Sequence, residues 1–335
     1  MAVQVAVVGG GVVGLSIAWL AARDGFAVTV SDDSSPHGGS WVAGGMLAPV
    51  TEAWPGEEAL LDLGVRSLDL WPRFARDLDV ELHTGGTLAV AVDRADAQVL
   101  DQLAAHLHGL GRTADRLTGR ELRRREPGLG PSVRSGLSVP GDLAVDNRSL
   151  LTALRRACVR AGAVFEERRV RAPDPSVVTV IAAGAWSGEL HDELKALVRP
   201  VKGEILRLTA RPGALPPPRH VVRAHVEGRQ VYLVPRHDGL VLGATQYEAG
   251  FDPAVTVGGV RDLLRDAETV LPGVAEYALT ESAAGFRAGS PDNLPIIRWL
   301  EPGVLAATGH HRNGVLLAPV TAHRVLDLLR TREDT

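Results

Sequence analysis

Three glycines near the start of the chain have the spacing of a phosphate-binding turn. Gly9, Gly11 and Gly14 directly follow the apolar run 3–8, and a helical pattern then continues to about Asp24. In such a turn the first glycine permits the tight bend, the second lets a pyrophosphate approach the backbone, and the third lets helix and strand pack closely. This pattern predicts a buried strand, a nucleotide-binding turn and a helix.

A second strand and an acidic residue complete the expected β-α-β unit. The run 27–31 ends at Asp32 and Asp33, close to the position where an acid accepts a hydrogen bond from a ribose hydroxyl. A glycine-rich turn without a ligand is the simpler alternative, and the uncharged stretch 5–22 also has the length of a membrane span. Because the glycines interrupt that stretch and no basic region precedes it, we expect neither a span nor a signal peptide.

The other end of the chain carries a second turn of possible chemical use. An apolar run, 303–308, leads into the sequence GHHRNGVLLAP at 309–319. The pattern predicts a strand, a tight turn through Arg312 and Asn313, and a helix to about Arg330. The N–H groups and partial positive charge of that helix start would face whatever lies beyond the strand. Many strand-to-helix turns look alike, and only the dinucleotide motif makes a ligand contact the more specific interpretation.

Composition narrows the class of protein. The chain has 335 residues and a net charge of −4, so no basic field favours a nucleic acid or a membrane surface. The run 120–126 mixes arginines with acids, as a solvated helix face does. A single cysteine, Cys158, excludes a disulfide framework and favours the cytoplasm. His106 and His108 lack a partner cluster, so we expect no metal site.

The order of patterns along the chain predicts an α/β protein with an insertion. Helix and buried-strand patterns of the nucleotide type occupy 1–80, 147–198 and 288–335, whereas strand-rich segments occupy 81–146 and 199–287. The expected fold is a Rossmann-like dinucleotide domain with an inserted, mostly antiparallel β-sheet (α+β) substrate domain. Consecutive domains would be the more common arrangement in NAD-dependent dehydrogenases.

Five passages, in order, carry a resemblance to a known family. They are Gly9–Gly14, Gly39–Pro49, Val201–Glu204, Tyr232–Arg236 and Gly309–Pro319. Over nearly its whole length the chain resembles the FAD-dependent amine and D-amino-acid oxidase superfamily. Within it, the chain looks most similar to the glycine oxidases of thiamine biosynthesis, because the second and fifth passages are typical of that subgroup.

The resemblance implies FAD as a cofactor that is bound without a covalent link, since Cys158 is far in sequence from the flavin-linking positions of covalent relatives. The implied cofactor contacts are Gly9, Gly11, Val12, Val13, Gly14, Asp32, Asp33, Gly39, Ser40, Gly44, Gly45, Met46, Val170, His310, His311, Arg312, Asn313, Gly314, Val315 and Leu316. The start of the last helix would then point at the flavin.

The implied substrate site comprises Arg287, Tyr232, Arg312, Met46 and Gln246, with Arg287 holding a carboxylate. A guanidinium grips a carboxylate in a fixed plane, which suits it to this role. Removal of a hydride from an amino acid needs no protein base if the bound amine is neutral, so we expect no obligatory catalytic acid or base.

The implied reaction is the oxidation of glycine by O2 and water to glyoxylate, ammonia and hydrogen peroxide, with the imine serving thiazole formation. A sarcosine or D-amino-acid oxidase or dehydrogenase remains an alternative, as does a flavin-binding module without activity. An NAD-dependent dehydrogenase would explain the glycine motif but not the passage at 309–319. Relatives also imply a homo-oligomer, for which a tetramer is one expected form.

Three departures from the family pattern qualify these expectations. Gln246 occupies a position that is apolar in the related pocket, which leaves the preference among glycine, sarcosine and D-alanine open. His311 replaces a usual aromatic residue. The stretch 171–176 is too short for the β excursion found in relatives, and this would leave the adenine end more exposed.

Overall fold

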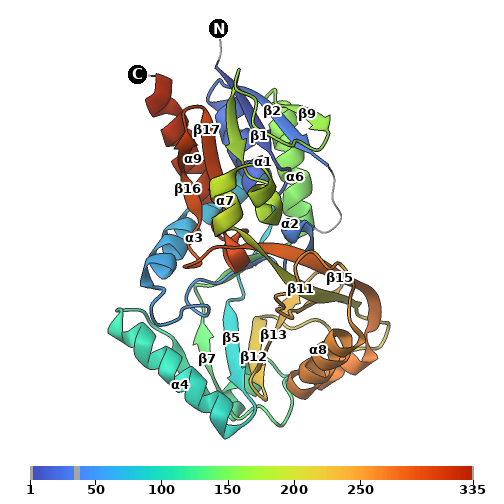
Figure 1. The fold of residues 1–335 in the computed structure, drawn as a ribbon. Helices are drawn as coiled ribbons and strands as arrows, with labels where there is room; N and C mark the ends of the chain where they lie inside the picture. Colours follow the sequence, from blue (N-terminus) through green and yellow to red (C-terminus); the bar gives the residue numbers. More distant parts are fainter. Residues whose placement is uncertain (1–2, 34–37, 334–335) are drawn as a thin grey trace.

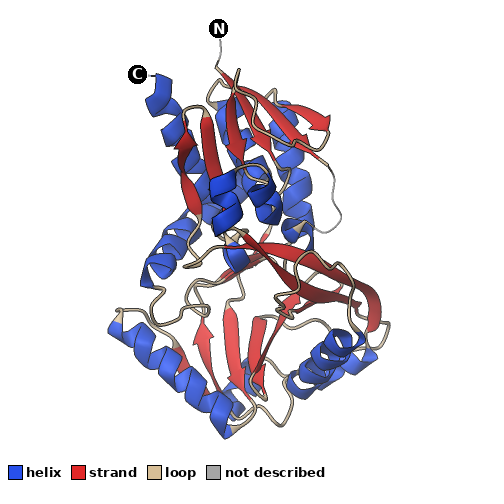
Figure 2. Cartoon of the chain, viewed as in Figure 1, coloured by secondary structure: helices blue, strands red, loops and turns tan. Residues whose placement is uncertain are grey.

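The computed structural model describes residues 3–33 and 38–333, and Figure 2 shows sheets with helices packed against them. Among these residues one sheet has six strands in the order β16-β17-β10-β1-β2-β9. The strands are β1 (Gln4–Val8), β2 (Ala27–Asp32), β9 (Val164–Glu167), β10 (Val178–Ile181), β16 (Ile296–Glu301) and β17 (Val304–Thr308). Only β16 at one edge is antiparallel to its neighbour. The parallel strands therefore end at one edge, where the connecting turns gather.

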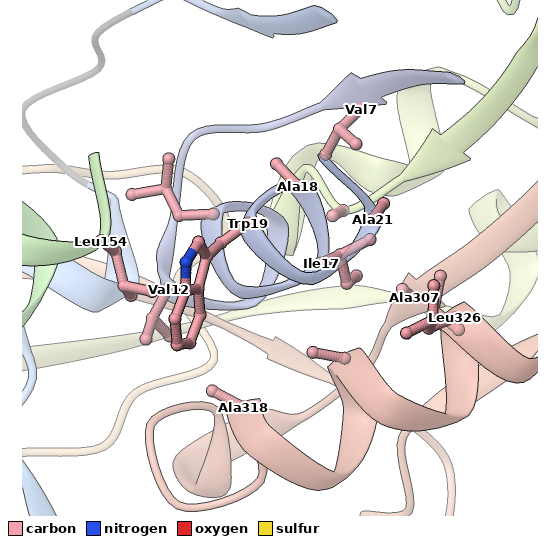
Figure 3. Close-up of a cluster of buried hydrophobic side chains, with 14 of the residues drawn as sticks. Val7, Val12, Ile17, Ala18, Trp19, Ala21, Leu154, Ala307, Ala318 and Leu326 are labelled. Carbon is pink, nitrogen blue, oxygen red and sulfur yellow. The ribbon is translucent and has the colours of Figure 1, made fainter. Parts of the chain in front are cut away.

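Alternating side chains bury both faces of this sheet. Val7 and Leu305 face a core built with helices α1, α3, α6 and α9, whereas Val8 and Ala306 face the short helices η1 and α7. Figure 3 shows part of the first core, in which Trp19 of α1 lies near Leu154 of α6. The helices are α1 (Val12–Arg23), α3 (Glu58–Leu78), α6 (Asn147–Arg160), η1 (Gly184–Glu189), α7 (Asp192–Leu197) and α9 (Ala318–Glu333).

The second sheet has eight strands in the order β15-β11-β14-β13-β12-β5-β7-β6. All neighbours are antiparallel except β12 and β5. The strands are β5 (Thr87–Ala91), β6 (Asp115–Thr118), β7 (Ser135–Val139), β11 (Arg199–Thr209), β12 (Val221–Val226), β13 (Arg229–Pro235), β14 (Gly239–Gly243) and β15 (Ala278–Gly289). Figure 1 shows the long pair β11 and β15 reaching from below the first sheet across the second.

Three helices and a short one accompany the second sheet, and α4 and α8 flank it in Figure 1. They are α4 (Arg94–Gly109), α5 (Gly119–Arg125), α8 (Val257–Val270) and η2 (Pro272–Glu276). A separate apolar core joins α8 to β11, β12, β13 and β14. The Thr118 hydroxyl oxygen accepts a hydrogen bond from the Glu121 amide and so caps α5. The Glu121 carboxylate in turn accepts a bond from the Thr118 amide, and the two bonds form a capping box. The basic run 120–126 is thus a helix and its end, as predicted.

A small third sheet accompanies the two larger ones, and helix α3 contacts the turn before α9. The strands β3 (Met46–Leu47), β8 (Leu143–Val145) and β4 (Leu82–His83) form the small sheet. The backbone oxygen of Leu316 accepts bonds from Ser67 Oγ at 2.6 Å and Trp71 Nε1 at 2.9 Å. Because both donors lie on α3, this helix fixes the turn that precedes α9.

The predicted fold class is confirmed, and each larger sheet takes its strands from one of the two predicted sets of segments. The division into two domains with those boundaries remains our proposal. The edge strands β9 and β16 were not predicted. No strand lies between β9 and β10, in agreement with the short stretch 171–176. In the described part of the chain, no helix combines the length and apolarity that a membrane crossing needs.

Candidate active site

A cavity of about 810 Å³ lies where the turns of the first sheet meet the second sheet. Most residues predicted for the cofactor and the substrate line it. From the cofactor set these are Gly9, Gly11, Val12, Val13, Asp32, Asp33, Gly39, Ser40, Gly44, Gly45, Met46, Val170, His310, His311, Arg312, Gly314 and Val315. From the substrate set they are Met46, Tyr232, Gln246, Arg287 and Arg312. The roles of these residues remain predictions, but their meeting in one cavity is a property of the structure.

The nucleotide end of the cavity is formed by backbone. Gly9 has φ +114, a conformation that favours glycine, and a side chain at Gly14 would collide with the Gly9 oxygen. At Gly11 an added Cβ would meet only Ser40, at 3.1 Å from its Oγ. The open surface above Gly11 fits a pyrophosphate, whereas Gly14 serves helix packing and does not line the cavity. The carboxylate of Asp32 lies against Gly10, where an added Cβ would be 2.5 Å from Oδ2.

A loop from the second predicted passage, Gly39–Pro49, is held over this end by three side chains. Ser40 Oγ accepts a bond from the Val12 amide at 3.0 Å, at the start of α1. The Asn147 amide donates to the backbone oxygens of Ser40 and Trp41, each at 2.9 Å. Arg236 Nη2 donates to the Gly44 oxygen at 2.8 Å. Residues of the loop that were predicted to border the cofactor are therefore held by hydrogen bonds within the protein.

The Arg287 guanidinium lies across the backbone of β11. A side chain at Gly203 would collide with this guanidinium in its present position, so a larger residue there would displace the Arg287 side chain. Nη1 has only long contacts, 3.4 Å to the Lys202 oxygen and 3.3 Å to the Thr245 oxygen. Among the described residues no carboxylate lies within 4.0 Å of Arg287, and burial lowers the pKa of its guanidinium. A partly buried cation without an anionic partner is costly, which suits it to bind an anionic ligand.

Tyr232 faces the same region from β13. Its ring fills the space left by two glycines, since a Cβ at Gly44 would be 2.8 Å from the ring and one at Gly243 2.5 Å from the hydroxyl. Burial raises the pKa of the Tyr232 phenol, so it stays a neutral hydrogen-bond donor. Tyr232 and Arg287 come from segments that are far apart in sequence, and they meet through the strand order β15-β11-β14-β13.

The turn before α9 differs in detail from the prediction. His311–Asn313 form a short 3₁₀ helix, and α9 begins only at Ala318, so its first turn does not start directly after Asn313. Asn313 and Leu316 do not line the cavity. The reason for Leu316 is clear, because its carbonyl is directed to Ser67 and Trp71 of α3.

Two neutral histidines belong to this turn. His310 is buried with Nε2 at 2.9 Å from Thr321 Oγ1, and burial lowers its pKa to about 4. His311 has φ +47, and neither ring nitrogen has a hydrogen-bond partner in the described part of the chain. Burial first, and then the charges of Arg287 and Arg312, lower the pKa of His311 to about 4. Both imidazoles are therefore uncharged at neutral pH.

Sequence reasoning missed several polar and aromatic residues of the wall, and four of them lie near the predicted substrate residues or in the strands and turns beside them. Glu52, Arg223, Gln230 and Trp186 line the cavity, and Glu52 forms ion pairs with both Arg223 and Arg312. Glu52 follows the Gly39–Pro49 passage by three residues, and Gln230 lies two residues before Tyr232 on the same strand. Proximity to these motifs was the available signal, whereas nothing in the sequence of β12 distinguished Arg223.

The fold and the glycine-lined cavity are those of a dinucleotide-binding protein with a cavity between two sheets. The chain belongs to the FAD dependent oxidoreductase family, whose pattern matches residues 4–328. Its cofactor is therefore FAD, and the nicotinamide alternative is set aside. When bound, FAD supplies a two-electron acceptor.

Similar proteins extend this assignment over the full chain. Glycine oxidase from Geobacillus kaustophilus is 30% identical over 98% of this chain and 93% of its own length. A crystal structure of that glycine oxidase superposes with a TM-score of 0.88, covering 98% of this chain and 95% of the other. The putative thiamine biosynthesis oxidoreductase ThiO from Rhizobium etli is 32% identical over 98% of this chain and 97% of its own.

A second group of relatives is longer. The bifunctional protein ThiO/ThiG from Trichormus variabilis is 32% identical over 97% of this chain, but the chain spans only 52% of that protein. The chain thus spans about half the length of the bifunctional relatives that it matches.

Proposed function

We propose that this protein is an FAD-dependent oxidase that converts glycine, O2 and water to glyoxylate, ammonia and hydrogen peroxide. The observation that carries the proposal is Arg287, a guanidinium in the cavity wall without a carboxylate partner in the described residues. A substrate carboxylate would supply that partner through charge-assisted bonds. The names of similar proteins, glycine oxidase and ThiO, support the choice of substrate and a role in thiamine biosynthesis.

In this proposal the protein orients a small amino acid within the cavity. Arg287 on β15 holds the carboxylate, and the Tyr232 hydroxyl adds a hydrogen bond from β13 of the same sheet. His311 is neutral and has both ring nitrogens unpartnered among the described residues, so it can accept a hydrogen bond from the substrate amine. No residue is needed as an obligatory base, because a neutral bound amine supplies the electron pair that expels the hydride.

The noncovalent mode of FAD binding and the cellular setting also belong to the proposal. Cys158 is buried, its Sγ lies 3.3 Å from the Leu15 oxygen, and it does not line the cavity. Burial raises the pKa of this thiol to about 12, so it stays protonated and unreactive. We propose a cytoplasmic enzyme that assembles as a homo-oligomer. We also propose that its imine product serves thiazole formation.

One experiment tests the reaction directly. The FAD-loaded protein is mixed with glycine, sarcosine, D-alanine and D-proline in turn, and peroxide is measured with oxygen present. In the absence of oxygen, bleaching of the flavin band by each compound is recorded. Glycine is expected to bleach the flavin and to give peroxide at the highest kcat/KM. Turnover of sarcosine or D-alanine with none of glycine would reject glycine as the substrate.

A further inference from the structure

Three guanidinium groups line the substrate end of the cavity, yet they differ in their partners. Arg287 has no carboxylate within 4.0 Å in the described part of the chain, as set out above. Arg223 of β12 and Arg312 of the turn before α9 line the same cavity, and both form ion pairs with Glu52. The neutral His311 adds no further charge. The balance of charge in this pocket therefore depends on Glu52.

Glu52 lies between the two arginines and uses both of its oxygens. Oε1 is 3.1 Å from Arg223 Nη1, and Oε2 is 3.3 Å from Arg312 Nε. The three side chains are mostly buried, at 12% exposure for Glu52, 16% for Arg223 and 25% for Arg312. Solvent screens such pairs weakly, so their charges cancel largely within the pocket.

The two arginines would respond differently to the loss of Glu52. Arg312 has a second partner, because its Nη2 lies 2.8 Å from Glu57 Oε2. Glu57 does not line the cavity and is held by Asn293 Nδ2 at 2.6 Å. For Arg223, Glu52 is the one carboxylate within 4.0 Å among the residues that the structure describes. Without Glu52, Arg223 would become a second cation of the cavity wall that lacks an anionic partner.

We propose that Glu52 is a specificity-determining residue, which neutralises Arg223 so that Arg287 is the guanidinium left for a ligand and the pocket selects monocarboxylates over dicarboxylates. This inference rests on the proposed function in one respect, namely that Arg287 takes the carboxylate of the substrate. A second carboxylate that approaches Arg223 meets the negative charge of Glu52 and loses its hydration without gaining a free cation. A neutral group in the same place avoids this penalty.

Pairs of ligands that differ by one charge test the proposal on the FAD-loaded enzyme. Malonate and succinate are each compared with their monoamides, malonamate and succinamate, and dissociation constants are measured by titration calorimetry at pH 8. In the parent the monoamide is expected to bind more tightly than the diacid. In Glu52→Gln the ratio of the dissociation constants of diacid and monoamide should change by roughly tenfold in favour of the diacid, an effect of about 1.4 kcal/mol. Flavin occupancy from the visible spectrum shows that each variant is loaded.

Three further variants separate selectivity from a structural role. Glu52→Asp keeps the charge, so it should retain most of the parent ratio. Glu57→Gln removes the same charge from the far side of Arg312, and we expect a change of less than about twofold because Glu52 remains. The double variant with Glu52→Gln and Arg223→Gln should lose the gain in diacid binding, since the uncovered guanidinium is gone.

The possible outcomes separate this inference from the proposed function. An unchanged ratio in a flavin-loaded Glu52→Gln protein would reject the role of Glu52, even if the parent oxidises glycine. An equal shift of the binding ratio in Glu57→Gln would also reject the role of Glu52. The total charge near the pocket, rather than the position of Glu52, would then determine the preference for the monoamide. If the parent oxidises a different monocarboxylate amino acid while the ratio shifts as expected, the choice of glycine fails and the role of Glu52 stands.

Discussion

The two ends of the cavity are built from different parts of the chain and from different chemical groups. At the nucleotide end, the turn after β1 presents glycine backbone, and the loop at 38–46 lies with it in the cavity wall. At the substrate end, side chains of Arg223, Tyr232 and Arg287 project from three strands of the second sheet. A cofactor common to many proteins is thus met by local backbone, and the particular substrate is met by long side chains from distant segments.

This contrast predicts that substitutions can impair substrate turnover and FAD binding separately. A substitution at the substrate end should alter turnover and leave FAD bound, whereas a substitution in the glycine turn should remove FAD from a folded protein. Substitutions that affect packing should lower the free energy of unfolding. They should not selectively lower turnover in FAD-loaded protein or selectively remove FAD from folded protein.

Replacement of Arg287 should have the largest effect. Arg287→Ala removes two charge-assisted bonds to the substrate carboxylate, so we expect kcat/KM for glycine to fall by about two to four orders of magnitude. That range corresponds to roughly 3–5 kcal/mol, from about 1.5–3 kcal/mol for each bond with a discount for non-additivity. Arg287→Lys should recover part of the activity because it keeps the charge but not the planar fork.

The flavin spectrum supplies the control for Arg287. Occupancy should be unchanged in both variants, and glycolate should bind to the parent but weakly to Arg287→Ala. A well-folded Arg287→Ala protein with near-normal kcat/KM would reject the carboxylate clamp and make Arg312 the next candidate.

At the nucleotide end, Gly11→Val should remove the cofactor and keep the fold. Gly11 has φ −75, which a branched residue can adopt, and among the described residues an added Cβ would come within 4 Å of Ser40 alone. The valine would fill the space meant for the pyrophosphate, so FAD affinity should fall by at least roughly a hundredfold, or about 3 kcal/mol. Circular dichroism checks that the fold is kept, and flavin occupancy checks that the cofactor is lost.

Gly14→Val is the matched comparison. A side chain there would collide with the Gly9 backbone oxygen, so this variant should lose soluble, folded protein along with FAD. If Gly11→Val kept full flavin occupancy, the pyrophosphate would not lie over this turn.

The difference between the two ends also explains what the sequence could reveal. The glycine turn was predictable because its spacing is a local property, in which each residue acts through its own backbone. Arg287 and Tyr232 were identified by resemblance alone, since their meeting depends on a strand order that no local pattern encodes. Glu52 and Arg223 were missed for the same reason, because an ion pair 171 positions apart in sequence leaves no periodic signal.

The start of the last helix shows a further limit. The run 309–319 predicted a turn followed by a helix, and both are present. Its hydrogen bonds to α3 were not predictable, yet they direct Leu316 away from the cavity and place the start of α9 at Ala318. Tertiary contacts thus decided the geometry of a turn whose existence was evident from the sequence.

A buried carboxyl group beneath the substrate end gives a prediction about pH. Asp142 accepts a bond from Thr51 Oγ1 at 2.8 Å, next in sequence to Glu52, and its other oxygen lacks a partner in the described residues. Burial raises the pKa of Asp142 to about 7. Because the unfolded value is about 3.9, the folded protein binds more protons between these values, and its stability should fall as pH rises through this window.

Asp142→Asn should remove that dependence. The amide oxygen still accepts the Thr51 bond, so the variant should be more stable than the parent at pH 8 by about 1–3 kcal/mol and similar at pH 4. Urea unfolding at several pH values measures both. Asp115→Asn, on an exposed site of β6, is the control and should leave the pH profile as it is in the parent. An Asp142→Asn profile that matches the parent profile would show that Asp142 is already ionised at low pH in the folded state.

The smallest expected effect concerns Gln246, which lines the substrate end but is exposed. Its amide can meet water, so it avoids the cost of an unsatisfied polar group, whereas an apolar residue there would contact a methyl group on the substrate nitrogen. Gln246→Met should therefore raise the ratio of sarcosine to glycine turnover by about fourfold, from roughly 0.8 kcal/mol for one buried methyl group. Gln102→Met on α4 is the control, because Gln102 is also exposed but does not line the cavity. The ratio of kcat/KM values for the two substrates is the measurement, since changes in flavin loading cancel in it. An equal ratio in the parent and in Gln246→Met would mean that this side chain does not contact the substrate nitrogen, and specificity at the amine would then rest on Tyr232 and Met46.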